Sequence, residues 1–177
     1  MSPFSRKKVY GGESQLKVFL SGQGRNAGED FEYGAALLLS VFRFSYFHYG
    51  LVPTLRDAPD LLAFTQANEL LIIDCTIRFP NENNKVSKLL SRTDQIRAML
   101  QSSGNAYIEI LPVVITALSR NSIDNDIREA AQRGVVVLTK ENIDDLMQRV
   151  IIPPTPSQLF AEAKILLNEA SKPRKSI

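Results

Sequence analysis

Residues 59–77 read PDLLAFTQANELLIIDCTI, and this stretch predicts the centre of the fold. Residues 60–65 and 70–77 have the length and composition of β-strands, and the short polar link 66–69 between them favours an antiparallel hairpin. The second run shows no apolar–polar alternation, which is typical of a strand covered on both faces. Asp60 opens the first strand and Asp74 lies near the end of the second. Antiparallel pairing therefore predicts that the two carboxylates lie close together.

The sequence on both sides of this hairpin predicts helices and further strands. Residues 30–44 carry apolar side chains at helical spacing, and residues 46–52 are aromatic and β-prone. Further patterns occur at residues 85–101 (helix), 106–118 (containing a strand), 123–133 (helix), 135–138 (strand), 141–150 (helix) and 157–170 (helix). This order predicts an α/β fold in which a mixed central β-sheet is flanked by helices, with an extra C-terminal helix.

Composition divides the chain into three regions. Residues 1–29 are rich in Gly, Ser and charged residues, so we expect an N-terminal extension or linker, in which residues 16–20 could form an edge strand. Residues 30–152 are expected to form the core. The proline-rich segment 153–156 opens the last region, residues 153–177, which we expect to be a C-terminal helix and a basic tail.

Composition and charge exclude several classes of protein. The 177 residues include 21 Lys and Arg against 19 Asp and Glu, so net charge alone does not indicate nucleic-acid binding. One cysteine, Cys75, and one histidine, His48, exclude internal disulfides, zinc fingers and His-rich catalytic metal sites. No apolar run approaches the ~18 residues of a membrane span and no signal peptide is recognisable, so we expect a cytoplasmic protein without membrane contact.

Two carboxylates placed this close predict a divalent cation between them. Like charges repel unless a cation neutralises them, and hard oxygen ligands suit Mg²⁺. An acid inside an apolar strand also carries a burial cost that requires a compensating partner. Two structural interpretations stay open: Asp60 as a turn residue after Pro59, and Asp74 as the ion-pair partner of Arg78 or Arg56.

An ordered set of motifs resembles the PD-(D/E)xK nuclease superfamily, whose members have the restriction endonuclease-like fold. The resemblance covers residues 28–150 and rests on an opening helix with Gly28, Phe31 and Glu32, on Pro59-Asp60, on Asp74-Cys75-Thr76, on the basic helix that follows, and on the segment 129–134. The chain is similar to a divergent branch in which acid-Cys-Thr replaces acid-x-Lys.

The resemblance implies a metal-dependent endo- or exodeoxyribonuclease that hydrolyses DNA phosphodiester bonds with Mg²⁺, for which Mn²⁺ could substitute. Asp60, Asp74 and the backbone carbonyl of Cys75 would hold the metal, and Glu32 would complete the site directly or through water. Taken alone, Glu32 fits a first-turn acid that favours the helix dipole, and Cys75 fits a small core residue.

The chain departs from the family at the lysine two residues after the second acid, where it has Thr76. A hydroxyl cannot supply the positive charge that a lysine places near the attacking water. Lys85 or Lys88 could replace this lysine from the following helix. The predicted catalytic residues are therefore Asp60, Asp74, Thr76, Lys85, Lys88 and Glu32.

A basic stripe follows from helical spacing in residues 85–101. Its members are Lys85, Lys88, Arg92 and Gln95. Such a stripe either faces the phosphates of a nucleic acid or is an ordinary solvated surface. The first interpretation assigns these four residues to nucleic-acid binding.

Two further motifs have competing interpretations. His48 lies among Tyr46, Phe47 and Tyr49, which favours packing in an edge strand, with base stacking by the aromatic rings as the alternative. The sequence around Gly22 and Gly24 fits a glycine-rich dinucleotide loop after a strand, but the acidic pair 29–30 would repel phosphate there. A flexible entry to the first helix explains the glycines better.

The leading hypothesis is a Mg²⁺-dependent nuclease domain, the effector of a restriction or anti-phage defence system. The alternative is an inactive nuclease-like fold that serves as a nucleic-acid-binding or assembly module, because Thr76 stands in place of the lysine. The expected substrate is DNA, with RNA as an open alternative. A homodimer through the apolar stripe of residues 159–167, or membership of a longer protein or multi-subunit system, would supply sequence specificity. The same stripe fits equally well an ordinary helix that docks on the core of its own chain.

Overall fold

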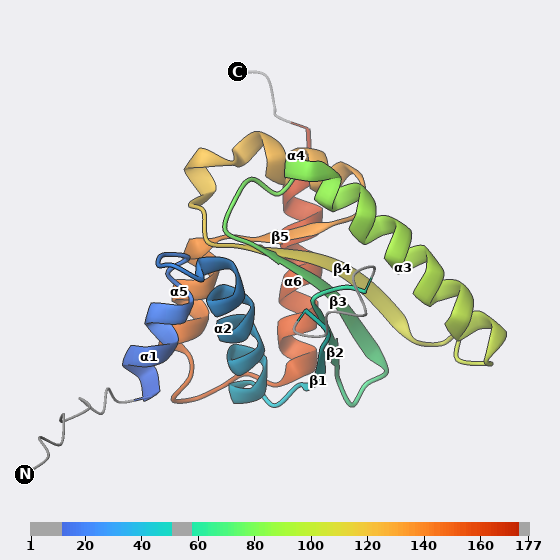
Figure 1. Ribbon diagram of the computed structural model, residues 1–177. Helices are drawn as coiled ribbons and strands as arrows, with labels where there is room; N and C mark the ends of the chain where they lie inside the picture. The colour runs from blue at the N-terminus through green and yellow to red at the C-terminus, as the bar shows by residue number, and fades with distance from the viewer. Residues whose placement is uncertain (1–11, 51–57, 174–177) are drawn as a thin grey trace, which may run out of the picture.

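The computed structural model describes residues 12–50 and 58–173 and contains a five-stranded sheet in the order β1-β2-β3-β4-β5 (Figure 1). The strands are β1 (Ser45–His48), β2 (Leu61–Phe64), β3 (Glu69–Thr76), β4 (Glu109–Thr116) and β5 (Val136–Leu138). The first three strands pair antiparallel, and β3, β4 and β5 pair parallel. The prediction of a mixed sheet with a central hairpin is confirmed.

Helices cover both faces of this sheet. They are α1 (Gly12–Phe19), α2 (Ala27–Val41), α3 (Lys85–Ser102), α4 (Asp124–Gln132), α5 (Lys140–Gln148) and α6 (Pro156–Ala170), with 3₁₀ turns η1 (Glu82–Asn84) and η2 (Arg120–Ser122). The helices α3 and α4 supply side chains to the core on one face, and α1, α2, α5 and α6 supply the core on the other (Figure 1). Within the described ranges, no helix has both the length and the apolar character needed to cross a membrane.

The central strand β3 is buried on both faces, as its unbroken apolar run predicts. Leu71, Ile73 and Cys75 belong to the core beneath α2 and α6, whereas Leu70 and Ile72 belong to the core beneath α3 and α4. Alternate residues of a strand point to opposite faces, so Asp74 points to the α3 face. Because that face is covered by α3, the Asp74 carboxylate is buried.

The prediction of an edge strand at residues 16–20 is wrong. These residues lie in and directly after α1, and Leu16 and Leu20 are buried while Lys17 and Val18 are exposed. A spacing of four residues places both leucines on one face of a helix, against α2. The dinucleotide-loop interpretation of Gly22 and Gly24 fails for the same reason, because that motif requires a preceding strand.

The aromatic segment after α2 starts the sheet as predicted. The helix ends at Val41 rather than at Phe44, because Arg43 adopts a left-handed φ of 63° and turns the chain into β1. β1 spans residues 45–48, whereas the prediction was 46–52, and residues 51–52 lie outside the described ranges. The proposed domain limits at residues 29 and 153 stay a prediction.

Gly22 lets the loop between α1 and α2 approach the ends of β3 and β4. Its φ is +66°, and a Cβ at this position would lie 2.6 Å from the Cβ of Ala117. We expect Gly22→Ala to lower the free energy of unfolding by about 1 to 3 kcal/mol, because backbone strain and steric overlap add. Denaturant titration measures this change. Gly28→Ala is the matched control, since its Cβ would meet nothing within 4 Å, and equal stability of the two variants would contradict the prediction.

Candidate active site

The hairpin brings Asp60 and Asp74 together, as their spacing predicts. Asp60 precedes Leu61, which pairs with Ile73, so the two acids lie opposite each other at the ends of β2 and β3. The backbone N–H of Asp60 donates to Asp74 Oδ1 at 3.4 Å, and the N–H of Cys75 donates to Asp60 Oδ2 at 2.7 Å. These bonds tie the position of each carboxylate to the backbone of the neighbouring strand.

Both acids line a cavity of about 220 Å³ between the end of β3 and the first half of α3. Its lining residues are Asp60, Asp74, Thr76, Arg78, Glu82, Asn83, Lys85, Lys88 and Arg92. Six of them were predicted as catalytic or nucleic-acid-binding residues. Three other predicted residues are not among its lining residues: Gln95 is exposed further along α3, Glu32 belongs to α2, and Cys75 is buried in β3.

Lys85 places its ammonium group against the end of β3. Its Nζ donates to the carbonyl oxygen of Cys75 and lies 3.7 Å from Asp60 Oδ2. Lys85 reaches this position because Asn83 and Asn84 adopt left-handed φ values of 56° and 58°, which turn the chain sharply before α3. Thr76 binds locally instead, since its Oγ1 accepts from the N–H of Arg78 at 3.1 Å. The positive charge that Thr76 cannot supply is therefore present at the same strand end.

Arg92 is the ion-pair partner of Asp74. Its Nη1 donates to both carboxylate oxygens, at 3.0 and 2.9 Å, and the Asp74 side chain is only 2% exposed. The predicted partner Arg78 binds Glu82 at 2.9 Å instead, and Arg56 lies outside the described ranges. Burial and the neighbouring Asp60 raise the pKa of Asp74, and Arg92 opposes this rise.

The spacing of Lys85 and Arg92 in the sequence pointed to the Arg92–Asp74 pair, but the predictions did not use it. Arg92 follows Lys85 by seven residues, which is two helical turns, so both side chains lie on one face of α3. That face covers the end of β3. Part of the predicted basic stripe, namely Lys85 and Arg92, therefore faces Asp60 and Asp74 rather than solvent.

Glu32 approaches the acid pair from α2, on the other side of the hairpin. Its Oε2 lies 3.7 Å from His48 Nε2, and a Cβ on Gly50 would lie 2.2 Å from the same oxygen. Burial raises the pKa of Glu32 to about 7, and the charge of Asp60 adds to this rise. Burial also lowers the pKa of His48, whose buried Nε2 has no hydrogen-bond partner among the described residues.

The oxygen atoms of this cavity suit a divalent cation in their chemistry. Asp60 and Asp74 line this cavity, and the Cys75 carbonyl contacts the ammonium of Lys85, which lines it too. Mg²⁺ commonly binds one or two carboxylates and keeps several waters. No group of three or more His, Cys, Asp or Glu side chains is arranged for a metal within the described ranges, so the carbonyl and water must complete such a site. The Lys85 ammonium now contacts that carbonyl and would have to move.

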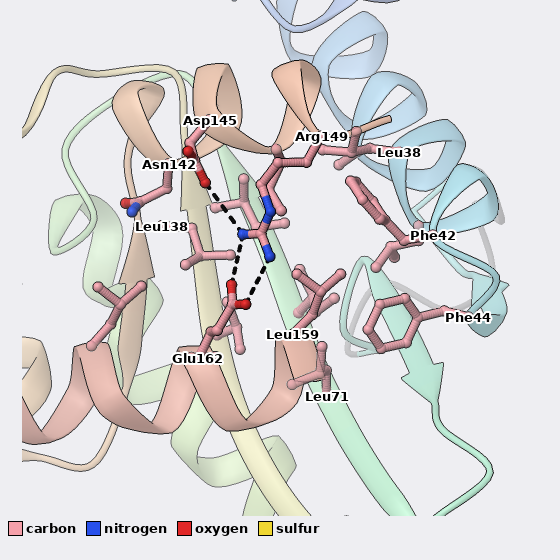
Figure 2. Close-up of a pocket in the computed structure, with 18 residues that line it drawn as sticks. Leu38, Phe42, Phe44, Leu71, Leu138, Asn142, Asp145, Arg149, Leu159 and Glu162 are labelled. Atoms are coloured by element: carbon pink, nitrogen blue, oxygen red, sulfur yellow. Dashed lines mark hydrogen bonds and ion pairs between the residues drawn. The ribbon is translucent and has the colours of Figure 1, made fainter. Parts of the chain in front are cut away.

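A second cavity, of about 100 Å³, lies on the opposite face of the sheet between α2, α5 and α6 (Figure 2). Its walls are mainly aliphatic and aromatic, and Arg149 closes one side by binding Glu162 at 2.7 and 2.8 Å and Asp145 at 3.3 Å (Figure 2). The carboxylates at its border are engaged by Arg149. This cavity is therefore a packing feature, and Asp60 and Asp74 line the cavity on the other face of the sheet.

The Glu162–Arg149 pair predicts a pH-dependent stability. Hydrogen bonds from Arg149 hold the pKa of Glu162 below its ordinary value of 4.5. A carboxylate with a lowered pKa in the folded state stabilises the fold above its unfolded pKa, and this contribution is lost as the pH falls through the folded pKa. We expect Glu162→Gln to lower the Tm by about 1 to 4 °C at neutral pH, since the pair is partly exposed.

Thermal unfolding across a pH series measures this effect. The difference in Tm between Glu162→Gln and the unmodified protein should shrink as the pH falls below 4.5. Glu169→Gln, an exposed position on the same helix, is the control and should leave the Tm unchanged at every pH. A difference that persists in acid would show that the variant acts through packing and not through charge.

The described structure is similar to a known nuclease subunit. It superposes on the crystal structure of the small subunit of the heterodimeric restriction endonuclease R.BspD6I with a TM-score of 0.64 and 13% sequence identity, over 86% of this chain and 87% of that chain. No protein-family model matches the sequence, and no curated protein is significantly similar to it. At this identity the likeness concerns the fold. The chain therefore has the α/β fold of a restriction endonuclease subunit, with a five-stranded mixed sheet and a C-terminal helix.

Proposed function

We propose that the chain is a Mg²⁺-dependent nuclease that hydrolyses DNA phosphodiester bonds, with Mn²⁺ as a substitute, in a restriction or anti-phage defence system. The observation that carries this proposal is the position of Lys85. Its ammonium contacts the Cys75 carbonyl and lies 3.7 Å from Asp60 Oδ2. This position supplies the charge that Thr76 lacks. The likeness to a restriction endonuclease subunit supports the same class of reaction.

Each residue of the cavity has a distinct part in this proposal. Asp60, Asp74 and the Cys75 carbonyl would hold the metal, and Glu32 would complete the site through water, since no third acidic side chain joins this pair within the described ranges. Bound Mg²⁺ supplies charge neutralisation at the phosphate and lowers the pKa of a coordinated water. Arg92 is a positioning residue, because its two hydrogen bonds hold the Asp74 carboxylate in one orientation.

The lysines of α3 act on the phosphate. Lys85 carries three N–H donors, so once its ammonium leaves the Cys75 carbonyl it can bind a phosphate oxygen and orient the attacking water. Lys88 lines the same cavity, is exposed, and makes no ion pair with any described residue. It can therefore attract the polyanionic backbone before the chemical step.

A second candidate function is a nuclease-like binding or assembly module that does not cut. The observation that favours it is the Arg92–Asp74 pair, in which one guanidinium nitrogen engages both oxygens of a proposed metal ligand. If this pair is permanent, the Asp74 carboxylate cannot also bind a metal well. The cavity would then bind nucleic acid, or a partner protein, through its lysines.

We also propose that the chain works with a partner subunit that reads the DNA sequence. The structure it resembles is the small subunit of a heterodimeric enzyme. The apolar stripe of α6 does not favour a homodimer, because Leu159 and Leu167 pack on this chain's own core and Phe160 is buried. This packing favours the interpretation in which α6 docks on the core of its own chain.

Incubation with supercoiled plasmid, linear duplex DNA and RNA tests the nuclease proposal. We expect nicking or cutting of DNA with Mg²⁺ or Mn²⁺, and none in EDTA. Cleavage of RNA alone would correct the substrate. Binding of DNA that weakens with salt, without cleavage in either ion, would contradict the nuclease proposal and favour the binding module.

A further inference from the structure

The edge strand β1 presents an ordered aromatic surface that has no part in the proposed phosphodiester hydrolysis. Phe47 is 56% exposed, yet its ring stacks on Tyr49 at a centroid distance of 6.2 Å and an interplanar angle of 25°. The edge of Phe47 also meets Phe64 at 6.2 Å and 90°. Core packing accounts for the neighbouring Tyr46, which contacts the core on the other face. It does not account for Phe47, whose ring is held in place while remaining open to solvent.

Strand register places this surface beside the acid pair. Phe47 pairs with Leu62, and Tyr49 lies opposite Asp60, whose carbonyl accepts from the Tyr49 N–H at 2.9 Å. Side chains directly opposite on antiparallel strands point to the same face. Tyr49, Asp60 and Asp74 therefore form a row across β1, β2 and β3. Neighbouring strands are about 4.8 Å apart, so the aromatic surface begins one strand away from Asp60.

The two sides of this row have complementary chemistry. On the α3 side the cavity carries Lys85 and Lys88, whose ammonium groups suit phosphate oxygens. On the β1 side, Phe47 and Tyr49 offer the faces and edges of aromatic rings. A nucleotide has the same division, since its phosphate is anionic and its base has two π-faces. In a closed duplex the bases are stacked on one another, so a protein ring can stack only on a base that is unpaired.

We propose that Phe47 and Tyr49 form a stacking surface for an unpaired base, and that the substrate is single-stranded or locally melted DNA. This inference rests on the proposed nuclease function and narrows its substrate class. Stacking on aromatic side chains tolerates every base, so this surface would select strand state and not sequence. Recognition of the DNA sequence would then depend on the proposed partner subunit.

The chain contains no tryptophan, which allows a direct test. Phe47→Trp introduces a single indole at the centre of the surface, and Tyr107→Trp introduces one at a 65% exposed position before β4. Each variant is titrated in EDTA, where no cleavage occurs, with an oligothymidylate of about 12 nucleotides and with a duplex of equal length. We expect the single strand to quench the emission of Phe47→Trp, with little change for the duplex or for Tyr107→Trp.

Affinity measurements give a second readout by fluorescence anisotropy of labelled DNA. Phe47→Ala should weaken binding of the single strand by about 5- to 100-fold and binding of the duplex by less than about twofold. Lys88→Ala should weaken both and reduce the dependence on salt. Unchanged emission of Phe47→Trp at saturation, or equal losses for both DNA forms in Phe47→Ala, would overturn the inference.

These outcomes are separable from failure of the nuclease proposal. Binding in EDTA does not require catalysis, so selective loss of single-strand affinity in Phe47→Ala would stand even if no metal supported cleavage. Conversely, metal-dependent cleavage of closed duplex that Phe47→Ala leaves unchanged would overturn the stacking surface and leave the nuclease intact. No measurable binding of the single strand would also contradict the inference.

Discussion

Replacing Asp74 by Asn is expected to reduce metal-dependent DNA cleavage by about 10³-fold or more. The amide has no charge to hold Mg²⁺ beside the phosphate, and the loss of several kcal/mol of transition-state stabilisation corresponds to this factor. The initial rate of plasmid nicking at saturating Mg²⁺ measures the effect. Titration of the variant with Mg²⁺ should also show weaker binding, which separates loss of the metal from loss of the chemical step.

Asp74→Asn has a structural cost that needs a second variant. Asp74 is buried and accepts two hydrogen bonds from Arg92, so the variant is destabilised by about 1 to 3 kcal/mol. Asp60→Asn is the cleaner test, because its amide oxygen can still accept from the N–H of Cys75. Asp94→Asn, an exposed position on α3, is the matched control. Cleavage at the unmodified rate by both Asp60→Asn and Asp74→Asn would exclude this site from catalysis.

Replacing Lys85 by Met is expected to lower kcat by about 10²- to 10³-fold, the effect of removing one electrostatic donor from a developing charge. Methionine keeps most of the aliphatic stem and removes the ammonium that contacts the Cys75 carbonyl. Single-turnover cleavage measures the loss. The same variant should bind Mg²⁺ more tightly, because the ammonium no longer competes for the carbonyl oxygen.

Lys88→Met is the matched control for this prediction. Lys88 lines the same cavity but contacts neither acid, so its removal should raise KM more than it lowers kcat. A large fall in kcat for Lys88→Met with little change for Lys85→Met would transfer the role of the missing lysine to Lys88. Weaker Mg²⁺ binding by Lys85→Met would contradict the competition between ammonium and metal.

The sequence predicted the parts of the fold that depend on local patterns. The hairpin follows from two apolar runs joined by a short polar link, and the length of that link fixes its register. The proximity of Asp60 and Asp74 is a consequence of that register, so it could be derived without further information. The helices α3 to α6 were visible because their apolar residues recur at helical spacing.

The sequence alone could not determine features that depend on contacts between distant segments. Residues 16–20 are too short to distinguish a strand from a helix, and only packing on α2 selects the helix. Arg92 could face solvent, a phosphate or an acid, and only the docking of α3 on β3 directs it to Asp74. Phe47 and Tyr46 are adjacent aromatics, and only the packing around β1 separates the partly buried ring of Tyr46 from the exposed ring of Phe47.

Local propensity and spacing therefore determined the elements, the hairpin and the acid pair, because these depend on residues close in the sequence. Tertiary structure decided which cation meets which oxygen and which aromatic ring stays open to solvent. The physical reason is that an ion pair or a ring contact depends on atomic distances between elements that are far apart in the sequence. Those distances are set by the packing of helices on the sheet.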